Sequence, residues 1–125
     1  MLDKENTNQG YLLGRLFATL VKIQEDANGK DANVKDTISK RYMNTISCTP
    51  AAVFSTIMNL SVHHSAKLSV GKAVYYEKLK QEIIDKLSSN AVPAHLDIQD
   101  QGLFFIGYYH QRQDFFTSKS AETEE

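Results

Sequence analysis

The sequence contains no tryptophan, one cysteine and two prolines among its 125 residues. The one thiol, Cys48, has no second cysteine with which to form an internal disulfide or a zinc knuckle. No apolar run reaches the roughly 18 residues that a membrane span needs. The first residues, with Asp3, Lys4 and Glu5, also lack the basic start and apolar run of a secretory signal. We therefore expect a cytoplasmic protein without a membrane partner.

Motifs of catalysis are also missing. The chain has no G-x-x-x-x-G-K-[ST], G-x-G-x-x-G or G-x-S-x-G pattern, which leaves nucleotide hydrolysis and serine hydrolysis without sequence support. His63 and His64 are adjacent, and adjacent helical residues point about 100° apart, whereas a helical metal pair needs a spacing of three or four. We expect no catalytic residue, no metal and no cofactor. A small metal-dependent enzyme at His63 and His64 is the alternative from the enzyme class.

Acidic residues are absent from a long internal window. No Asp or Glu lies between Thr37 and Tyr76, although the chain as a whole has a net charge of -1. The cations and histidines of this window are Lys40, Arg41, His63, His64, Lys67 and Lys72. Uncancelled cations of this kind are typical of a surface that binds a polyanion. A helical hairpin whose acids lie elsewhere by chance is the simpler interpretation of the same pattern.

Helical periodicity is present along most of the chain, whereas the strict alternation of strands is not. The pattern predicts five helices, over about 10–27, 32–45, from Pro50 to a break at 69–71, from that break to about 87, and over about 97–116. The size of the chain suits one hydrophobic core. We predict an all-α, compact bundle of about five helices over residues 1–117, followed by a disordered acidic tail over residues 118–125.

Local signals support two of the helix starts. Thr49 before Pro50 places a hydroxyl acceptor at the N-cap and a preset ring at the first helical position. Asp97 with Asp100 resembles a capping box. The stripes expected to face the core are Val53, Ile57, Leu60 and His64 in the third helix, and Leu103, Ile106, Gly107 and His110 in the fifth, flanked by Phe104 and Tyr108.

Gly14 and Gly107 each lie within a strongly apolar helical pattern. Glycine there costs about 1 kcal/mol relative to alanine, so another interaction should offset it. We predict that both glycines mark close crossings between the first and last helices.

Residues 107–113 interleave aromatic rings with hydrogen-bond donors. Tyr108, Tyr109, His110 and Arg112 could stack on bases or bind phosphate oxygens, as in single-strand binders. The alternative is an amphipathic helix that buries its tyrosine rings and leaves their hydroxyls in water.

Several segments resemble, in order, the C-terminal region of the type I-C CRISPR large subunit. These segments are residues 6–18 (NTNQGYLLGRLFA), 49–54 (TPAAVF), 73–78 (AVYYEK), 93–96 (PAHL) and 101–113, which begins QGLF and ends GYYHQRQ. They span nearly the whole chain. In that family the C-terminal region is also made as a separate protein, from an internal translation start, and serves as the small subunit of the effector complex called Cascade.

The resemblance implies a helical bundle whose copies stack along the particle. It also implies contacts to the backbone subunits that coat the guide RNA, contacts to the large subunit, and support for the opened target DNA. Catalysis is not implied, because a recruited helicase-nuclease cleaves the DNA. A C-terminal fragment of the large subunit would have nearly the same sequence, so the alternative is that the chain is the terminal domain of the large subunit itself.

We therefore expect a non-catalytic small subunit that stabilises the R-loop, formed by guide RNA and target DNA, through phosphate contacts without base readout. The expected contact residues are Lys40, Arg41, Lys67, Lys72, Arg112, Arg15 and His63. Arg15 and Arg112 lie within segments that carry the resemblance, whereas the others rest on charge and helical position. The rival expectation is a purely structural assembly adaptor that does not touch nucleic acid.

Overall fold

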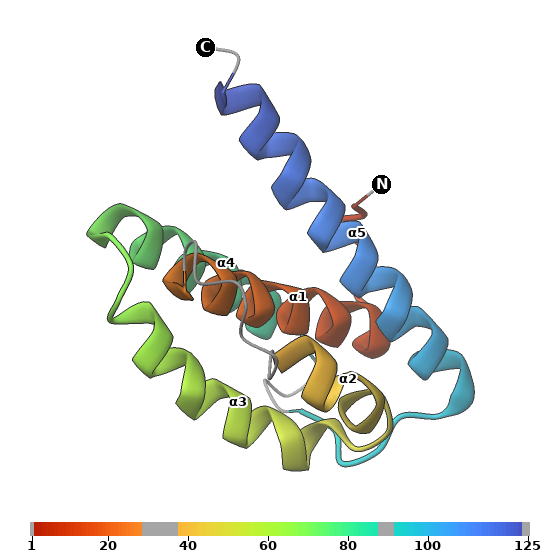
Figure 1. Ribbon diagram of the computed structural model, residues 1–125. Coiled ribbons are helices and arrows are strands. Elements are labelled where there is room, and N and C mark those ends of the chain that lie inside the picture. The colour runs from red at the N-terminus through yellow and green to blue at the C-terminus, as the bar shows by residue number, and fades with distance from the viewer. Residues whose placement is uncertain (1, 29–37, 88–91, 124–125) are drawn as a thin grey trace.

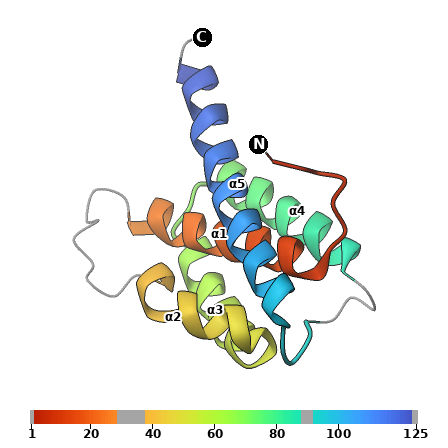
Figure 2. The same cartoon turned by 90° about the vertical axis from the view of Figure 1, so that its right-hand side faces the viewer.

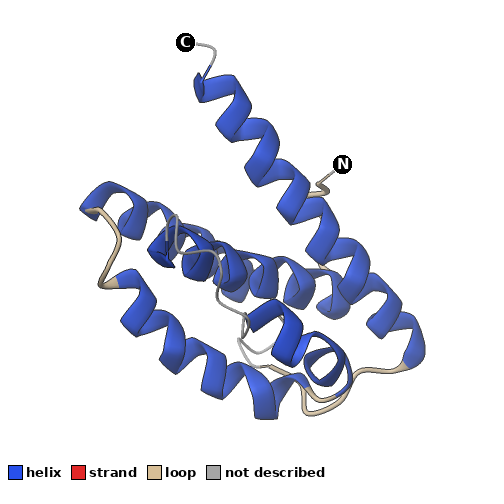
Figure 3. Cartoon of the chain, in the orientation of Figure 1, coloured by secondary structure: helices blue, strands red, loops and turns tan. Residues whose placement is uncertain are grey.

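Five helices make up the fold. The computed structural model describes the backbone of residues 2–28, 38–87 and 92–123, and the side chains of residues 2–27, 42–87 and 92–117. The helices are α1 (Gln9–Asn28), α2 (Ile38–Cys48), α3 (Pro50–Ser65), α4 (Val70–Lys86) and α5 (Ile98–Thr123) (Figures 1 and 3). The described residues contain no strand. The all-α prediction with five helices is confirmed.

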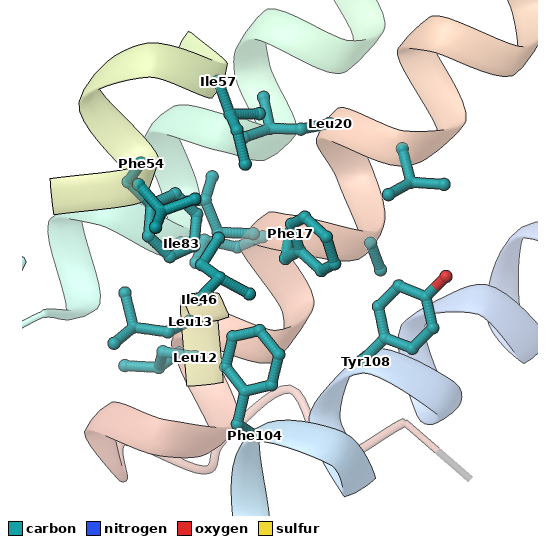
Figure 4. Packing of buried hydrophobic residues seen from close by; sticks show 14 of the residues in the cluster. Leu12, Leu13, Phe17, Leu20, Ile46, Phe54, Ile57, Ile83, Phe104 and Tyr108 are labelled. Atoms are coloured by element: carbon teal, nitrogen blue, oxygen red, sulfur yellow. The ribbon is translucent and has the colours of Figure 1, made fainter. Parts of the chain in front are cut away.

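Helix α1 is the centre of the bundle. Every residue from Gly10 to Gln24 is buried, because α5, α3 and α4 all pack against it (Figures 1 and 2). A helix with apolar side chains on most of its circumference needs this enclosure, and its polar residues Arg15, Thr19, Lys22 and Gln24 are buried along with them. The largest buried side chains of the core include Leu12, Leu13, Leu16, Phe17 and Leu20 of α1, Ile46 of α2, Phe54 and Ile57 of α3, Ile83 of α4 and Phe104 of α5 (Figure 4).

The crossing of α1 and α5 is close because glycine stands on both helices. A Cβ atom on Gly14 would overlap the backbone of Phe104, and one on Gly107 would overlap the backbone of Tyr11. Gly10 makes a third such approach, to Asp100. The predicted close crossing at Gly14 and Gly107 is confirmed. The contacts from Gly10 and Gly14 advance along both helices together, so α1 and α5 run in the same direction.

Helix starts agree only in part with their sequence signals. Pro50 occupies the first turn of α3, as predicted, but Thr49 accepts no capping hydrogen bond. Its hydroxyl instead donates to the carbonyl oxygen of Thr45, at 3.2 Å, so the capping role was wrong. At the start of α5, Asp97 Oδ1 accepts the backbone N–H of Asp100 at 2.8 Å, which confirms that part of the capping prediction.

Two of the predicted core stripes are displaced. In α3, Leu60 is exposed whereas Ser61 is buried. In α5, Ile106 is exposed and the buried side is formed by Phe104, Gly107, Tyr108, Gln111 and Phe115. The displacement in α5 has a physical cause, since the helix turns Gly107 toward α1 to make the close crossing.

Two predicted helix limits also differ. The second helix was expected from about residue 32, but residues 29–37 lie outside the described part of the chain, and the described helix continues to Cys48 rather than 45. Helix α5 was expected to end near Phe116 and runs to Thr123. The side chains of residues 118–125 are not described, so their assignment as a disordered tail stays a prediction. Within the described ranges, no helix is long and apolar enough to cross a membrane.

Candidate nucleic-acid interface

The predicted contact residues are distributed over four places in the fold: α2, the end of α3 with the start of α4, α5, and the interior of α1. Lys40 and Arg41 belong to α2, but their side chains lie outside the described residues. His63, at the end of α3, and Lys67, in the turn after it, are exposed. Lys72 follows in the first turn of α4 with a side chain 59% exposed. We call His63, Lys67 and Lys72 the α3–α4 corner.

Acids from outside the acid-free window partly compensate its charge. Asp26, near the end of α1, lies 4.0 Å from Lys72 Nζ and 3.3 Å from Lys22 Nζ. Asp26 also accepts a hydrogen bond from the hydroxyl of Tyr76. The fold therefore brings an acid to α4 across 46 residues of chain. Of the corner residues, Lys72 is the one that this acid reaches.

Arg112 lies on α5, apart from the corner, and is also paired. Its Nη1 atom is 2.8 Å from Glu25 Oε1, in an ion pair without hydrogen-bond geometry. The guanidinium lies 5.1 Å from the centre of the Phe116 ring. Lys22 Nζ lies 5.5 Å from the centre of the same ring. Two cations and two acids thus meet at the end of α1, beside an aromatic ring.

Arg15 is in the interior and does not line the surface with the other cations. It is only 2% exposed, and its Nε donates to Gln111 Oε1 at 2.9 Å. Its Nη1 atom is buried without a hydrogen-bond partner. Burial lowers the pKa of Arg15, and the proximity of Tyr11 and Asp114 opposes that shift. The expectation of a surface contact through Arg15 was wrong because α5 covers this side of α1.

Burial also shifts the pKa values of two other side chains, Tyr76 and His64. Burial, followed by the hydrogen bond to Asp26, raises the pKa of Tyr76 well above its ordinary value. Burial, followed by the charges of Lys67 and His63, lowers the pKa of His64. His64 Nδ1 is buried without a hydrogen-bond partner. A neutral His64 beside the α3–α4 corner therefore adds no charge to it near neutral pH.

The aromatic segment 107–113 is divided between the core and the surface. Tyr108 is buried and packs with Phe17, at 5.6 Å between ring centres (Figure 4). Tyr109 is 62% exposed. His110 Nδ1 lies 3.0 Å from the hydroxyl oxygen of Tyr11. Of the two adjacent tyrosines, only Tyr109 is available to an external ligand.

Sequence reasoning missed Glu25 and Asp26, the acids that pair with two of the predicted cations. A signal for them existed, because two acids in the last turns of a helix lie at the negative end of its dipole. Acids at that position are better tolerated when cations from another element reach them. The identity of those cations, Lys72 and Arg112, depends on how the helices pack. In the described part of the chain, no group of three or more His, Cys, Asp or Glu could hold a metal ion.

Comparison with known proteins identifies one family. The sequence model of the CRISPR-associated protein family Csd1 matches residues 1–116, which is nearly the entire chain. No curated protein matches the chain. The matched residues include all of helices α1 to α4 and most of α5. The chain therefore belongs to the Csd1 family of CRISPR-associated proteins.

Proposed function

We propose that this chain is the non-catalytic small subunit of a type I-C Cascade and that it holds opened target DNA by contacts to phosphates. The observation that carries the proposal is the α3–α4 corner, where His63, Lys67 and Lys72 are exposed in a segment without acids of its own. Lys40 and Arg41 of the same segment, and Arg112 of α5, complete the proposed contact set. Arg15 is not part of it.

The energetics suit a weak, non-specific contact. R-loop formation is nearly balanced, so a few contacts to the DNA backbone are enough to shift it. Lys72 is held only loosely by Asp26, since the atoms are 4.0 Å apart and the lysine side chain is 59% exposed. Asp26 is only 11% exposed and is also bound by Lys22 and Tyr76, so it keeps partners when Lys72 turns to a phosphate.

The proposed setting is the assembled particle in the cytoplasm. Its partners there are the backbone subunits that coat the guide RNA, the large subunit, and another copy of this chain. Membership of a CRISPR-associated family supports this setting. The DNA sequence is chosen by pairing with the guide RNA, so the chain needs no base readout.

A purely structural assembly adaptor is the second candidate, and so is a role as the C-terminal domain of the large subunit. Exposed apolar side chains favour docking to protein, because Val62 is 65% and Val70 is 81% exposed beside the same corner. An adaptor would use these side chains for assembly and would leave the cations in water.

The experiment compares DNA affinity of particles assembled with different forms of the chain across a salt series. The test variant is Lys67→Glu with Lys72→Glu. Its matched control is Lys4→Glu with Lys78→Glu, which makes the same charge change at exposed lysines outside the acid-free window. We expect the test variant to bind target DNA more weakly than the wild type, toward the affinity of a particle lacking the chain, with a salt slope shallower by about two.

The control should bind like the wild type, apart from a small effect of overall charge. If the test variant assembles and binds DNA as tightly as the control does, the proposed phosphate contact is wrong and the adaptor is favoured. Reversal of Lys40 and Arg41 to Glu, in a second pair of particles, tests the contribution of α2.

A further inference from the structure

One side of α5 is turned away from the bundle and carries aromatic side chains. Ile106, Tyr109, Gln113 and Phe116 follow one another at spacings of three, four and three, and all four are exposed. These spacings place them on one side of the helix, roughly opposite the buried stripe that packs on α1. We call these four residues the α5 outer face. The C-terminal half of α5, which carries Gln113 and Phe116, extends beyond the other helices in both views (Figures 1 and 2).

The two rings of the face are open to a ligand. Tyr109 is 62% and Phe116 is 51% exposed. The neighbouring ring of Tyr108 meets Tyr109 at an interplanar angle of 78°, so the two rings are not stacked on each other. Phe116 has Arg112 and Lys22 close to its ring, at 5.1 and 5.5 Å. Both cations are paired with acids, Arg112 with Glu25 and Lys22 with Asp26, so a phosphate bound here would replace a carboxylate. Cations beside an aromatic ring suit a ligand that combines flat bases with phosphates.

Acids are absent from most of this face. Residues 101–113 of α5 contain no Asp or Glu, and Asp114 is the one acid between Ile106 and Phe116. The face offers the Tyr109 hydroxyl and the Gln113 amide, and Ile106 is its one aliphatic member. A surface that docks another helix is usually a continuous apolar stripe. Here an amide interrupts the rings, which suits a base with polar edges better.

We propose that the α5 outer face is a stacking platform for the bases of single-stranded nucleic acid, with Tyr109 as its main ring and Phe116 as its second. This inference rests on the proposed function and deepens it, because it adds contacts to bases where that function has only contacts to phosphates. Stacking does not depend on base identity, since every base has a π-face. The platform therefore holds a strand without selecting its sequence.

The spacing of the rings sets the register of the strand. Tyr109 and Phe116 are seven residues apart, which is about 10.5 Å along the helix axis. A strand that rises about 3.4 Å per nucleotide passes the two rings about three nucleotides apart. An oligonucleotide of four residues is then the shortest that reaches both rings.

The experiment measures binding of the full chain to a 12-residue oligothymidylate and to a 12-residue abasic strand with the same number of phosphates. Fluorescence anisotropy at low salt reports both affinities, and circular dichroism confirms that each variant is folded. We expect the wild type to prefer oligothymidylate at least about 5- to 150-fold, the range for stacking of one base. Tyr109→Ala should remove most of this preference and Tyr109→Phe should keep it.

Tyr75→Ala is the matched control, since Tyr75 of α4 is 50% exposed and lies off the α5 outer face. It should keep the preference for oligothymidylate. For strands of four or more residues, Phe116→Ala should reduce the preference for oligothymidylate over the abasic strand. For shorter strands, that preference should be unchanged.

Three results would overturn the platform. Equal affinity for the two strands would show phosphate contacts alone, and the proposed function would then stand without the platform. Loss of assembly into the particle in Tyr109→Ala, with oligothymidylate binding unchanged, would show that the face docks protein. Absence of binding to either strand at millimolar concentration would also exclude it. Conversely, a preference removed by Tyr109→Ala, with no effect of Lys67→Glu and Lys72→Glu on the particle, keeps the platform and rejects the phosphate contacts of the corner.

Discussion

Arg15 is a charged residue buried between α1 and α5, and its side chain donates a hydrogen bond to Gln111. Its guanidinium is held by Gln111 and by packing between α1 and α5, and no acid forms an ion pair with it among the described residues. Asp114, Glu82 and Asp3 are close enough to favour its positive charge without bonding to it. Such a residue keeps its place by packing its long side chain as well as by charge.

Reversal of this charge should therefore unfold the chain and not merely weaken its binding. Arg15→Glu places a buried anion among Asp114, Glu82 and Asp3 without a cation. We expect the free energy of unfolding to fall by at least about 3 kcal/mol, measured by urea denaturation. Lys67→Glu, at an exposed position, should change it by less than about 0.5 kcal/mol. Equal stability of the two variants would contradict the buried position of Arg15.

The raised pKa of Tyr76 leads us to expect that the free energy of unfolding falls at alkaline pH. The folded chain raises the pKa of Tyr76, whereas an unfolded tyrosine loses its proton near pH 10. The contribution of Tyr76 is therefore complete below about pH 10 and is lost as the pH rises above it. Tyr76→Phe should be less stable by about 1–2 kcal/mol at pH 8 and should lack this alkaline loss.

Urea denaturation between pH 8 and 11 measures both effects. Tyr109→Phe is the matched control, because it removes an exposed hydroxyl, and its pH profile should follow that of the wild type. Parallel profiles for Tyr76→Phe and the wild type would show that the bond to Asp26 does not protect the Tyr76 proton.

At the scale of elements, the crossing of α1 and α5 is the main contact of the bundle. Gly10, Gly14 and Gly107 let the two backbones approach more closely than any larger residue allows. Close approach also lengthens the contact between the helices and positions the rings of Phe17 and Phe104, 5.8 Å apart. The intrinsic disadvantage of glycine in a helix is thereby offset by packing.

Alanine substitutions test this crossing. In Gly14→Ala the new methyl group would overlap the backbone of Phe104, so the helices must separate. We expect a loss of about 2–3 kcal/mol in the free energy of unfolding. Gly102→Ala, on α5 with open space around it, should instead gain about 0.5–1 kcal/mol. Thermal melts of both variants measure the difference, and a stabilised Gly14→Ala would refute the close crossing.

At the scale of the whole molecule, the bundle depends on α5 because it covers α1 from the far end of the sequence. The part of α5 that packs in the core reaches Phe115. Beyond it the chain carries one lysine and three glutamates over residues 118–125. This segment should matter for charge and little for stability.

Truncation separates these two roles. A chain that ends after Thr117 should melt within a few degrees of the full chain, since no described core residue is removed. Its net charge rises by two, so its affinity for oligothymidylate at low salt should increase. A chain that ends after Gly102 should be unfolded by circular dichroism, because α1 loses its cover. A large drop in the melting temperature of the chain that ends after Thr117 would show that the tail packs on the bundle.

The sequence by itself determined the number and type of the helices, most of their limits, and the glycine crossing. The helices follow from the apolar periodicity of neighbouring residues. The crossing follows from glycines whose cost within a helix must be offset by close packing. The sequence did not show which surface cations are paired with acids or which aromatic side chains are exposed. Tertiary structure decided that Glu25 and Asp26 reach Arg112 and Lys72, which lie far away in the chain. It also decided that Tyr108 is buried and Tyr109 exposed, since adjacent helical residues point about 100° apart and the orientation of α5 about its own axis decides which of them faces α1.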